Sequence, residues 1–360
     1  MKRVTVPIGP QHPLLKEPLS FLLTVEGEKV MTSNLRLGYV HRGIEQLSQS
    51  RNYIQNVHLF ERVCGICSHI HTTTFCMGVE ELAGVTVPLR GQFLRTFFCE
   101  MERVHSHLLW LGVLAKNMGF ETIFMFAWRD REIILDLMEK LSGGRVSHAV
   151  NVIGGVRVDI EDHQRRNILN QLNNLSEKIA FLQDMVASET SFRGRTCGVG
   201  TLSAEQIRKY CVVGPVARAS NVDVDLRRDA PYSAYNQLTV NVITRKEGDI
   251  WGRTMLRIQE AQESIRLCEE IIHALPEGEI QTPVKRRIPA GEVVCRTEAP
   301  RGELVYYIRS DGSDQPARVK IRTPSLTALV SLPDQLRDVN LADVSAVISG
   351  VDLCIACADR

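Results

Sequence analysis

Four cysteines, arranged as two Cys-x-x-Cys pairs, are the residues whose spacing points most directly to chemistry. Cys64 and Cys67 form the first pair, and Cys354 and Cys357 form the second. The short turn inside each pair directs both sulfurs to one side, where two thiolates can bind the same metal. Together the pairs supply four soft ligands, so a shared site would join the two ends of the fold.

The spacing of the cysteines does not by itself identify the metal. Two Cys-x-x-Cys pairs most often indicate structural zinc, but zinc knuckles place their pairs close together, and here nearly the whole chain lies between them. A chain of 360 residues also needs no metal to stabilise its core. Four thiolates suit nickel or iron–sulfur chemistry as well. The other six cysteines are expected to be small buried apolar residues: Cys76, Cys99, Cys197, Cys211, Cys268 and Cys295.

Composition limits the class of protein. The net charge of +1 argues against a nucleic-acid platform, so no nucleic-acid partner is expected. The longest apolar run, residues 108–115, is too short to span a bilayer, and the first residues lack the apolar core of a signal peptide. We therefore expect a cytoplasmic protein that meets a membrane only through partner subunits.

Apolar spacing predicts an α+β, predominantly helical fold formed by one domain, residues 1–360. Residues 1–45 are expected to form a loop and a hairpin, and residues 281–360 a β-containing C-terminal part. The helical core between them spans residues 46–280, where apolar residues recur at steps of three and four. The clearest helical stripes are residues 93–111, 168–185 and 251–272, and the expected strands are residues 19–25, 29–37, 292–298, 304–309 and 318–322.

The residues around the cysteines resemble a known family. Residues 62–71 are similar to the N-terminal signature of the nickel–iron hydrogenase large subunit, and residues 352–357 resemble its C-terminal partner, with Leu353 where the family usually has Pro. Other segments resemble the complex I 49-kDa subunit: residues 9–13, 41–45, 102–109, 298–303 and 318–325. With both features, the sequence resembles the large, catalytic subunit of an energy-converting, membrane-bound hydrogenase. That group includes Ech-type and CO-induced hydrogenases and the hydrogenase of formate hydrogenlyase.

The resemblance implies a nickel–iron centre and a role for each paired cysteine. Cys64 and Cys354 would be terminal nickel ligands, and Cys67 and Cys357 would bridge nickel to an iron that also carries carbon monoxide and cyanide. Cys354 would accept a proton during turnover. Glu17 would be the first station for that proton, because burial raises the pKa of a carboxylic acid toward the working pH. The alternative is a solvated loop carboxylate paired with the neighbouring lysine.

Other residues also receive roles from the resemblance. Arg301 would place its guanidinium over the metals, Ser325 would hydrogen-bond a cyanide, and His71 would orient a bridging thiolate. The alternatives are a surface ion pair for Arg301 and a purely structural role for His71. Glu45 matches a carboxylate that in some relatives binds a magnesium or iron ion near the C-terminus. The usual His ligand of that ion is replaced by Arg360, which could pair with a carboxylate instead.

The implied function is hydrogen oxidation or proton reduction coupled to ion translocation by partner subunits, as in anaerobic metabolism. No further iron–sulfur spacing is visible, so an iron–sulfur small subunit, ferredoxin-like electron-transfer subunits and integral membrane subunits are expected partners. The complex would lie on the inner face of the cell membrane. The rivals are a complex I-type quinone-reductase subunit, whose family has lost the cysteines, and a zinc-stabilised scaffold. Many relatives carry a C-terminal extension that a protease removes, so this chain is expected to be a processed form or one without the extension.

Overall fold

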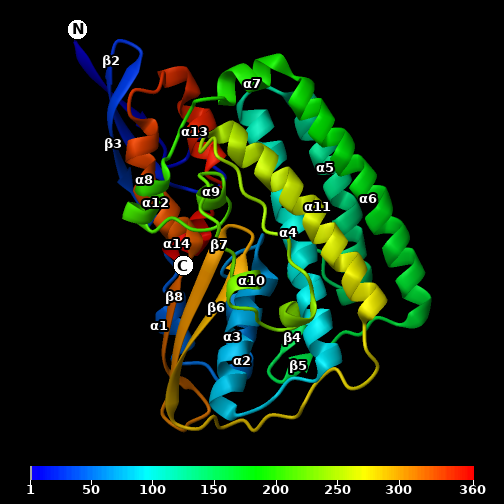
Figure 1. Ribbon diagram of the computed structural model, residues 1–360. Helices are drawn as coiled ribbons and strands as arrows, with labels where there is room; N and C mark the ends of the chain where they lie inside the picture. The colour runs from blue at the N-terminus through cyan, green and yellow to red at the C-terminus, as the bar shows by residue number, and fades with distance from the viewer. Residues whose placement is uncertain (1) are drawn as a thin grey trace.

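Long helices dominate the middle of the chain, and small antiparallel sheets lie in its first and last parts (Figure 1). The computed structural model describes residues 2–360. The first half contains β1 (Arg3–Ile8), β2 (Ser20–Glu26), β3 (Lys29–Arg36), α1 (Ile44–Ser48), α2 (Tyr53–Glu61), α3 (Ser68–Ala83), α4 (Leu89–Asn117), α5 (Glu121–Ser142), β4 (Asn151–Val152), β5 (Gly155–Val156) and α6 (Asp162–Ser188). The second half contains α7 (Thr190–Thr196), α8 (Ala204–Tyr210), α9 (Pro215–Arg218), α10 (Leu226–Asp229), η1 (Tyr235–Gln237), α11 (Ile250–Ala274), β6 (Gly291–Ala299), β7 (Gly302–Ser310), β8 (Pro316–Arg322), α12 (Pro324–Leu336), η2 (Leu341–Asp343), α13 (Val344–Gly350) and α14 (Ile355–Asp359).

The three predicted helical stripes are confirmed as α4, α6 and α11. These helices pack with α5 into the layer on the right of Figure 1. Side chains mark where two of them begin. Glu161 and Gln164 form a capping box at the start of α6, and the Asp249 side chain accepts a hydrogen bond from a backbone N–H of α11. No helix of residues 2–360 has both the length and the apolar character needed to cross a membrane.

The strands agree with the prediction except at β1 and at the short pair β4 and β5, which lies within the region expected to be helical. The expected strands of the hairpin and of the C-terminal part are confirmed as β2, β3, β6, β7 and β8. Residues 3–8, expected to be irregular, form β1, which pairs with β2 at the edge of the sheet. Most of β1 is exposed and it contains Pro7, so it lacks the apolar run of a buried strand, and an edge position tolerates the proline.

The helix that follows the first cysteine pair, α3, lies against β6 and β7. A Cβ added at Gly78 of α3 would lie only 2.7 Å from a side-chain carbon of Ile308, so a glycine allows this close approach. A second apolar cluster forms here, with Phe60, Phe75 and Tyr306 among its fully buried members. The first and last parts of the chain also meet, because Val30 donates a backbone hydrogen bond to the carbonyl of Val339. In Figure 1 the blue strands accordingly lie beside the red helices.

The prediction for the six unpaired cysteines is wrong at two positions. Cys76, Cys99, Cys268 and Cys295 are buried as expected, but Cys197 and Cys211 are exposed. Both exposed residues follow the last turn of short surface helices, α7 and α8. Small size alone therefore does not place a cysteine in the core.

Candidate metal centre

The four paired cysteines meet in one buried cluster. The Sγ atoms of Cys64 and Cys354 lie 3.2 Å apart, those of Cys67 and Cys357 lie 3.5 Å apart, and those of Cys354 and Cys357 lie 3.2 Å apart. All four side chains are buried. Two overlapping sets of ligand atoms in the cluster are close enough to hold a metal ion, and one of them includes His71. The two ends of the chain thus form a single donor set.

Turns and helix starts next to each cysteine pair fix the positions of its sulfurs. The first pair lies in the turn between α2 and α3, where the backbone N–H of Ile66 donates to Cys64 Sγ at 3.2 Å and Cys67 immediately precedes α3. The carboxylate of Glu102 on α4 accepts hydrogen bonds from two N–H groups in the first turn of α3, at 2.6 and 3.1 Å. Cys354 immediately precedes α14, and Cys357 lies within it. Each pair is therefore fixed by a helix start.

The proximity of the sulfurs separates their proton affinities. Hydrogen bonds from Cys354, Cys357 and Cys67 hold the pKa of Cys64 well below its ordinary value. The corresponding contacts raise the pKa of Cys357 well above it. Binding of a soft metal ion by such a cluster would release the remaining thiol protons.

Arg301 lies beside the cysteines in the two-residue turn between β6 and β7. The turn needs a glycine next, because Gly302 has a φ of 123° and a Cβ there would lie 2.7 Å from the backbone nitrogen of Gly214. The side chain of Arg301 is only 4% exposed, and it donates from Nε to the Asp352 carbonyl and from Nη2 to Asp352 Oδ1, both at 3.0 Å. Arg301 is thus ion-paired in the interior rather than at the surface.

The remaining guanidinium nitrogen of Arg301, Nη1, is buried and has no hydrogen-bond partner among residues 2–360. Burial opposes the charge, but Asp352 and the sulfurs of Cys354, Cys67 and Cys64 outweigh it and raise the pKa of Arg301 well above its ordinary value. A buried donor without a partner is costly. A centre bound by four thiolates and carrying polar diatomic ligands would supply the missing acceptor, so the residues present fit a nickel–iron group.

Asp352 anchors this arrangement. Its other contacts are Lys16, with Nζ 3.4 Å from Oδ1, and Arg257, with Nη2 3.8 Å from Oδ2. Burial alone would raise the pKa of Asp352, but the nearby Arg301, Lys16 and Arg257 lower it, so the carboxylate stays ionised. The backbone of Asp352 has a φ of 61°, and Leu353 follows it without the rigid turn of a proline.

His71 and Ser325 both contact the cysteine cluster. His71 Nε2 lies 3.4 Å from Cys357 Sγ, and its Nδ1 lies 2.7 Å from the hydroxyl of Tyr306. Burial lowers the pKa of His71 to about 4. The Ser325 hydroxyl accepts a hydrogen bond from the backbone N–H of Cys354 at 3.2 Å. His71 thus lies beside a cysteine of the second pair, and Ser325 contacts the backbone of the other; the predicted roles of His71 toward a bridging thiolate and of Ser325 toward a cyanide stay predictions.

Glu17 also lies beside the second pair. Its Oε2 accepts a hydrogen bond at 2.7 Å from the backbone N–H of Ala356, which lies between Cys354 and Cys357. The neighbouring Lys16 pairs with Asp352, as described above, so the alternative of a Glu17–Lys16 pair finds no support. Sequence reasoning gave no role to Tyr306 or Asp352, although the Asp-x-Cys spacing could have indicated the second.

Glu45 forms an ion-paired cluster at the C-terminal residue. Arg360 Nε lies 2.9 Å from Glu45 Oε1, which also accepts the backbone N–H of Ile321 at 3.0 Å, and Lys320 Nζ lies 3.0 Å from Oε2. Burial raises the pKa of Glu45, but Arg360 and the other donors outweigh it and lower the pKa overall. The predicted pairing of Arg360 with a carboxylate is confirmed. A magnesium or iron ion at Glu45 stays a prediction, and these two cations already balance its charge.

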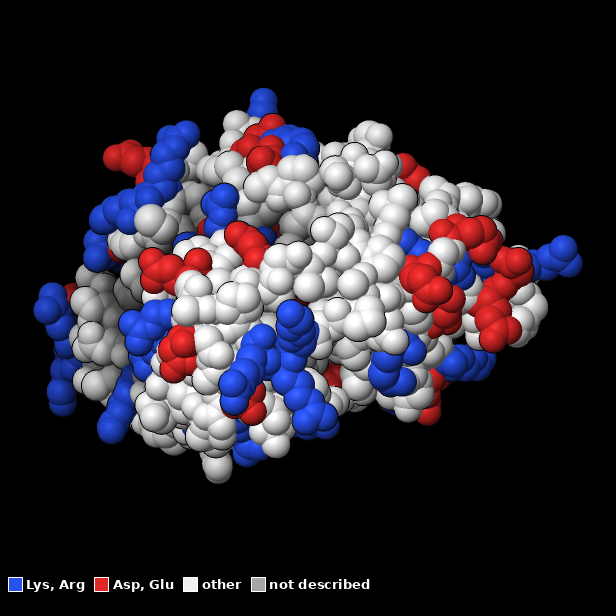
Figure 2. All heavy atoms as spheres, turned by 90° about the horizontal axis from the view of Figure 1, so that it is seen from below, with Lys and Arg blue, Asp and Glu red and all other residues white. Residues whose placement is uncertain are grey.

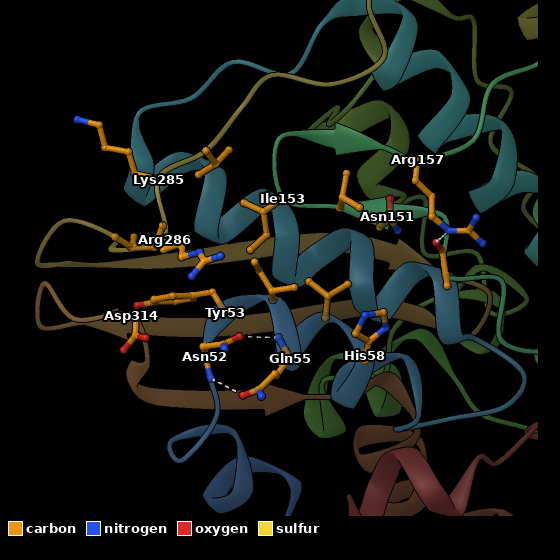
Figure 3. A pocket seen from close by; sticks show the side chains of 16 residues that line it. Asn52, Tyr53, Gln55, His58, Asn151, Ile153, Arg157, Lys285, Arg286 and Asp314 are labelled. Atoms are coloured by element: carbon orange, nitrogen blue, oxygen red, sulfur yellow. Dashed lines mark hydrogen bonds between the residues drawn. The ribbon is translucent and has the colours of Figure 1, made fainter.

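A cavity of about 550 Å³ opens beside α2, the helix that precedes the first cysteine pair. Its walls come from the start of α2, the β4–β5 region and residues 284–288, and they are largely apolar with a basic rim (Figure 3). Figure 3 shows the guanidinium of Arg286 turned toward Ile153 and Tyr53, whereas Lys285 points away. One wall residue, His58, accepts a hydrogen bond through its carbonyl from Arg62, two residues before Cys64. The cavity therefore borders the segment that leads into the first cysteine pair.

Fold and site together define a predominantly helical α+β protein with a buried cluster of four cysteines. The family model described as "Respiratory-chain NADH dehydrogenase, 49 Kd subunit" matches residues 117–288 and 282–360, and the model "Nickel-dependent hydrogenase" matches residues 42–117. The chain is 39% identical to the carbon monoxide-induced hydrogenase of Rhodospirillum rubrum, with 100% of each chain covered.

Other relatives carry both kinds of name. The chain is 36% identical to the membrane-bound hydrogenase subunit alpha of Pyrococcus furiosus, over 99% of this chain and 87% of that one. It is also 36% identical to an NADH-quinone oxidoreductase subunit of Rhizobium meliloti, over 100% and 96%. A chain of the membrane-bound sulfane sulfur reductase, an archaeal respiratory membrane complex, superposes with a TM-score of 0.95 at 30% identity, over 99% and 98%.

This chain therefore belongs to the family that unites the 49-kDa subunit of respiratory NADH dehydrogenase with the large subunits of energy-converting, membrane-bound hydrogenases. The resemblance seen in the sequence is confirmed, as is the α+β, predominantly helical fold.

Proposed function

We propose that this chain is the catalytic subunit of a membrane-associated nickel–iron hydrogenase. The observation that carries the proposal is the convergence of four buried sulfurs near a buried arginine whose Nη1 has no partner among residues 2–360. Family membership alone leaves the role open, because the relatives include both hydrogenases and quinone oxidoreductase subunits. A quinone site needs no cluster of soft ligands, so the four sulfurs favour the hydrogenase.

The cysteines would hold nickel and iron in the arrangement that the resemblance implies, with Cys64 and Cys354 terminal and Cys67 and Cys357 shared. The bound metals would supply Lewis-acid activation of hydrogen for heterolytic cleavage. Arg301 contributes a fixed positive charge and free N–H donors beside the centre, which stabilise negative charge there. The surrounding apolar cluster keeps bulk water away from the sulfurs.

Protons need a defined route through this apolar surrounding. Cys354 is the proposed acceptor and Glu17 the first relay, because the Glu17 carboxylate is bonded to the backbone between the two cysteines of the second pair. Glu17 also lines a cavity of about 30 Å³ with Leu353 and Ile355, the residues that flank Cys354. A cavity of that size accommodates a water molecule that could continue the route.

Electrons and coupling require partner subunits. We propose that the partner docking over the cavity of Figure 3, near the first cysteine pair, is an iron–sulfur small subunit. Ferredoxin-like subunits and integral membrane, ion-translocating subunits would complete a complex on the inner face of the membrane. The view from below shows basic and acidic side chains together on one face rather than a single-sign field, which suits protein partners better than nucleic acid (Figure 2).

A zinc-stabilised scaffold is the second candidate, because zinc also binds four thiolates. It leaves the unpartnered Nη1 of Arg301 and the position of Glu17 without a purpose. Metal analysis of the purified complex separates the two candidates: nickel with iron supports the hydrogenase, and zinc alone supports the scaffold. Infrared bands of metal-bound carbon monoxide and cyanide would give independent support.

The matched variants are Cys357→Ser, in the cluster, and Cys76→Ser, which changes a buried cysteine of α3 outside the cluster. We expect the first to abolish nickel binding and hydrogen-dependent dye reduction, because a hard alkoxide is a poor replacement for a shared thiolate. The second is expected to keep both, with some loss of stability. Full activity of Cys357→Ser would refute the assignment.

A further inference from the structure

Three buried side chains form one hydrogen-bonded line that ends on the metal centre. The hydroxyl of Tyr306 lies 2.7 Å from His71 Nδ1, and His71 Nε2 lies 3.4 Å from Cys357 Sγ. Tyr306, His71 and Cys357 come from β7, the first turn of α3, and α14. Their relative exposures are 0%, 1% and 3%, so no solvent competes for these bonds.

We infer that Tyr306 is a positioning residue that selects the tautomer of His71 and thereby makes His71 a hydrogen-bond donor to Cys357. The inference rests on the proposed role of Cys357 as a metal ligand. Within the part of the chain that the structure describes, the imidazole is the one hydrogen-bond partner of the Tyr306 hydroxyl. A buried hydroxyl donates where an acceptor is available, and the acceptor here is Nδ1.

This donation decides which ring nitrogen of His71 carries the proton. An Nδ1 that accepts a hydrogen bond carries no proton, so the proton of the neutral imidazole lies on Nε2. Nε2–H points at a sulfur that is a thiolate when it binds metal, and the contact is attractive. In the other tautomer the Nε2 lone pair would face the thiolate at 3.4 Å, which is repulsive. Both ends of the imidazole therefore favour the same tautomer.

The ring of Tyr306 is itself fixed by aromatic packing. It meets Phe60 edge to face, with centroids 5.3 Å apart and an angle of 88°, and Phe60 packs on Phe75 at 4.6 Å. The ring therefore cannot turn its hydroxyl away from His71 without disturbing both phenylalanines. With the proposed metals bound, a hydrogen bond donated to Cys357 would withdraw electron density from its sulfur and so tune the metals that it holds.

Tyr307 supplies a matched control on the same strand. Its side chain lies on the opposite face of β7, and its hydroxyl donates to Glu292 at 2.8 Å, away from the cysteines. Tyr306→Phe and Tyr307→Phe remove the same atom from adjacent residues. Only the first is expected to affect His71.

The test uses the full chain loaded with zinc alone, which is diamagnetic and holds Cys357 as a thiolate. With ring-¹⁵N-labelled histidine, the His71 signal is assigned by its loss in His71→Gln. In the wild type we expect one-bond coupling to hydrogen at Nε2 and none at Nδ1. Tyr306→Phe removes one of the two restraints, so a second population with a protonated Nδ1 is expected beside the first, while Tyr307→Phe keeps the single tautomer.

A proton on Nδ1 in the wild-type zinc protein would overturn the inference, and this measurement does not depend on whether the variant folds. An unchanged His71 spectrum in folded Tyr306→Phe would overturn it as well. In the enzyme with its native metals, the carbonyl stretching band is expected to move to lower wavenumber in Tyr306→Phe. Zinc-only metal content in the native complex would instead refute the proposed function and leave the tautomer result standing.

Discussion

The Arg301→Lys variant gives the sharpest test of the role proposed for Arg301 at the candidate metal centre. The wild-type guanidinium makes two charge-assisted hydrogen bonds to Asp352 and leaves a third nitrogen, Nη1, buried without a partner among residues 2–360. Lysine keeps the charge but has a single nitrogen, so it cannot serve Asp352 and the metal centre together. Losing one such bond to Asp352 costs about 2 kcal/mol of unfolding free energy.

The fold should survive this loss. Asp352 keeps Lys16 and Arg257 as neighbouring cations, so its charge is not left uncompensated. Metal content is accordingly expected to stay normal. Hydrogen-dependent dye reduction should fall by roughly 100-fold or more, because one preorganised donor to developing charge is worth that much.

The matched control is Arg296→Lys, on the same hairpin. Arg296 pairs with Glu303 at the surface, with its side chain 53% exposed, so its conservative replacement should leave the rate unchanged. The assay is dye reduction normalised to nickel, with a urea unfolding curve for each variant. A parental rate in Arg301→Lys at full nickel content would show that the buried guanidinium does not act on the centre.

Three further changes test other parts of the site. Glu17→Gln keeps the bond to the backbone but cannot relay a proton, so hydrogen–deuterium exchange should collapse with metals intact, and persistent exchange would exclude this route. His107 bonds to Glu260 at 2.9 Å, and burial lowers its pKa from 6.5 to about 4. As pH falls below 6.5, His107 is protonated in the unfolded state but stays neutral in the folded state, so protonation lowers the free energy of unfolding of the wild type. His107→Gln lacks this protonation. The loss of unfolding free energy that it causes, measured in urea, should therefore be about 2 kcal/mol smaller at pH 5 than at pH 7.5. Gly302→Ala should destabilise the fold by several kcal/mol and lower nickel content, because its Cβ would strike Gly214, and thermal unfolding would detect this.

The sequence predicted the parts of the fold that depend on local pattern. The stripe in residues 93–111 and the alternation in residues 304–309 correspond to α4 and β7 because their periods reflect buried faces. The sequence did not predict the edge strand β1, because its residues are mostly exposed and include Pro7, so it has no apolar pattern. The sequence did not predict that two cysteines are exposed, because their burial depends on which helix ends reach the surface.

In the candidate site, too, some contacts were predictable from the sequence and others were not. The convergence of the four cysteines was predictable from their spacing, and geometry bears it out. The contacts of Tyr306 with His71 and of Arg301 with Asp352 were not, because neither pair of residues belongs to a ligand motif whose spacing would indicate a shared site. Such contacts depend on how α3 and α14 meet the sheet, which no local pattern encodes.

The meeting of the chain's two ends has a consequence for biosynthesis. The sulfurs of Cys64 and Cys354 are separated by 290 positions, and the final turn also bonds to Glu17 and Glu45. Synthesis runs from the N-terminus, so the first cysteine pair waits through most of translation for the second. A product interrupted anywhere before Cys354 lacks half of the donor set. The proposed metal uptake would therefore reject any polypeptide that ends before the second pair.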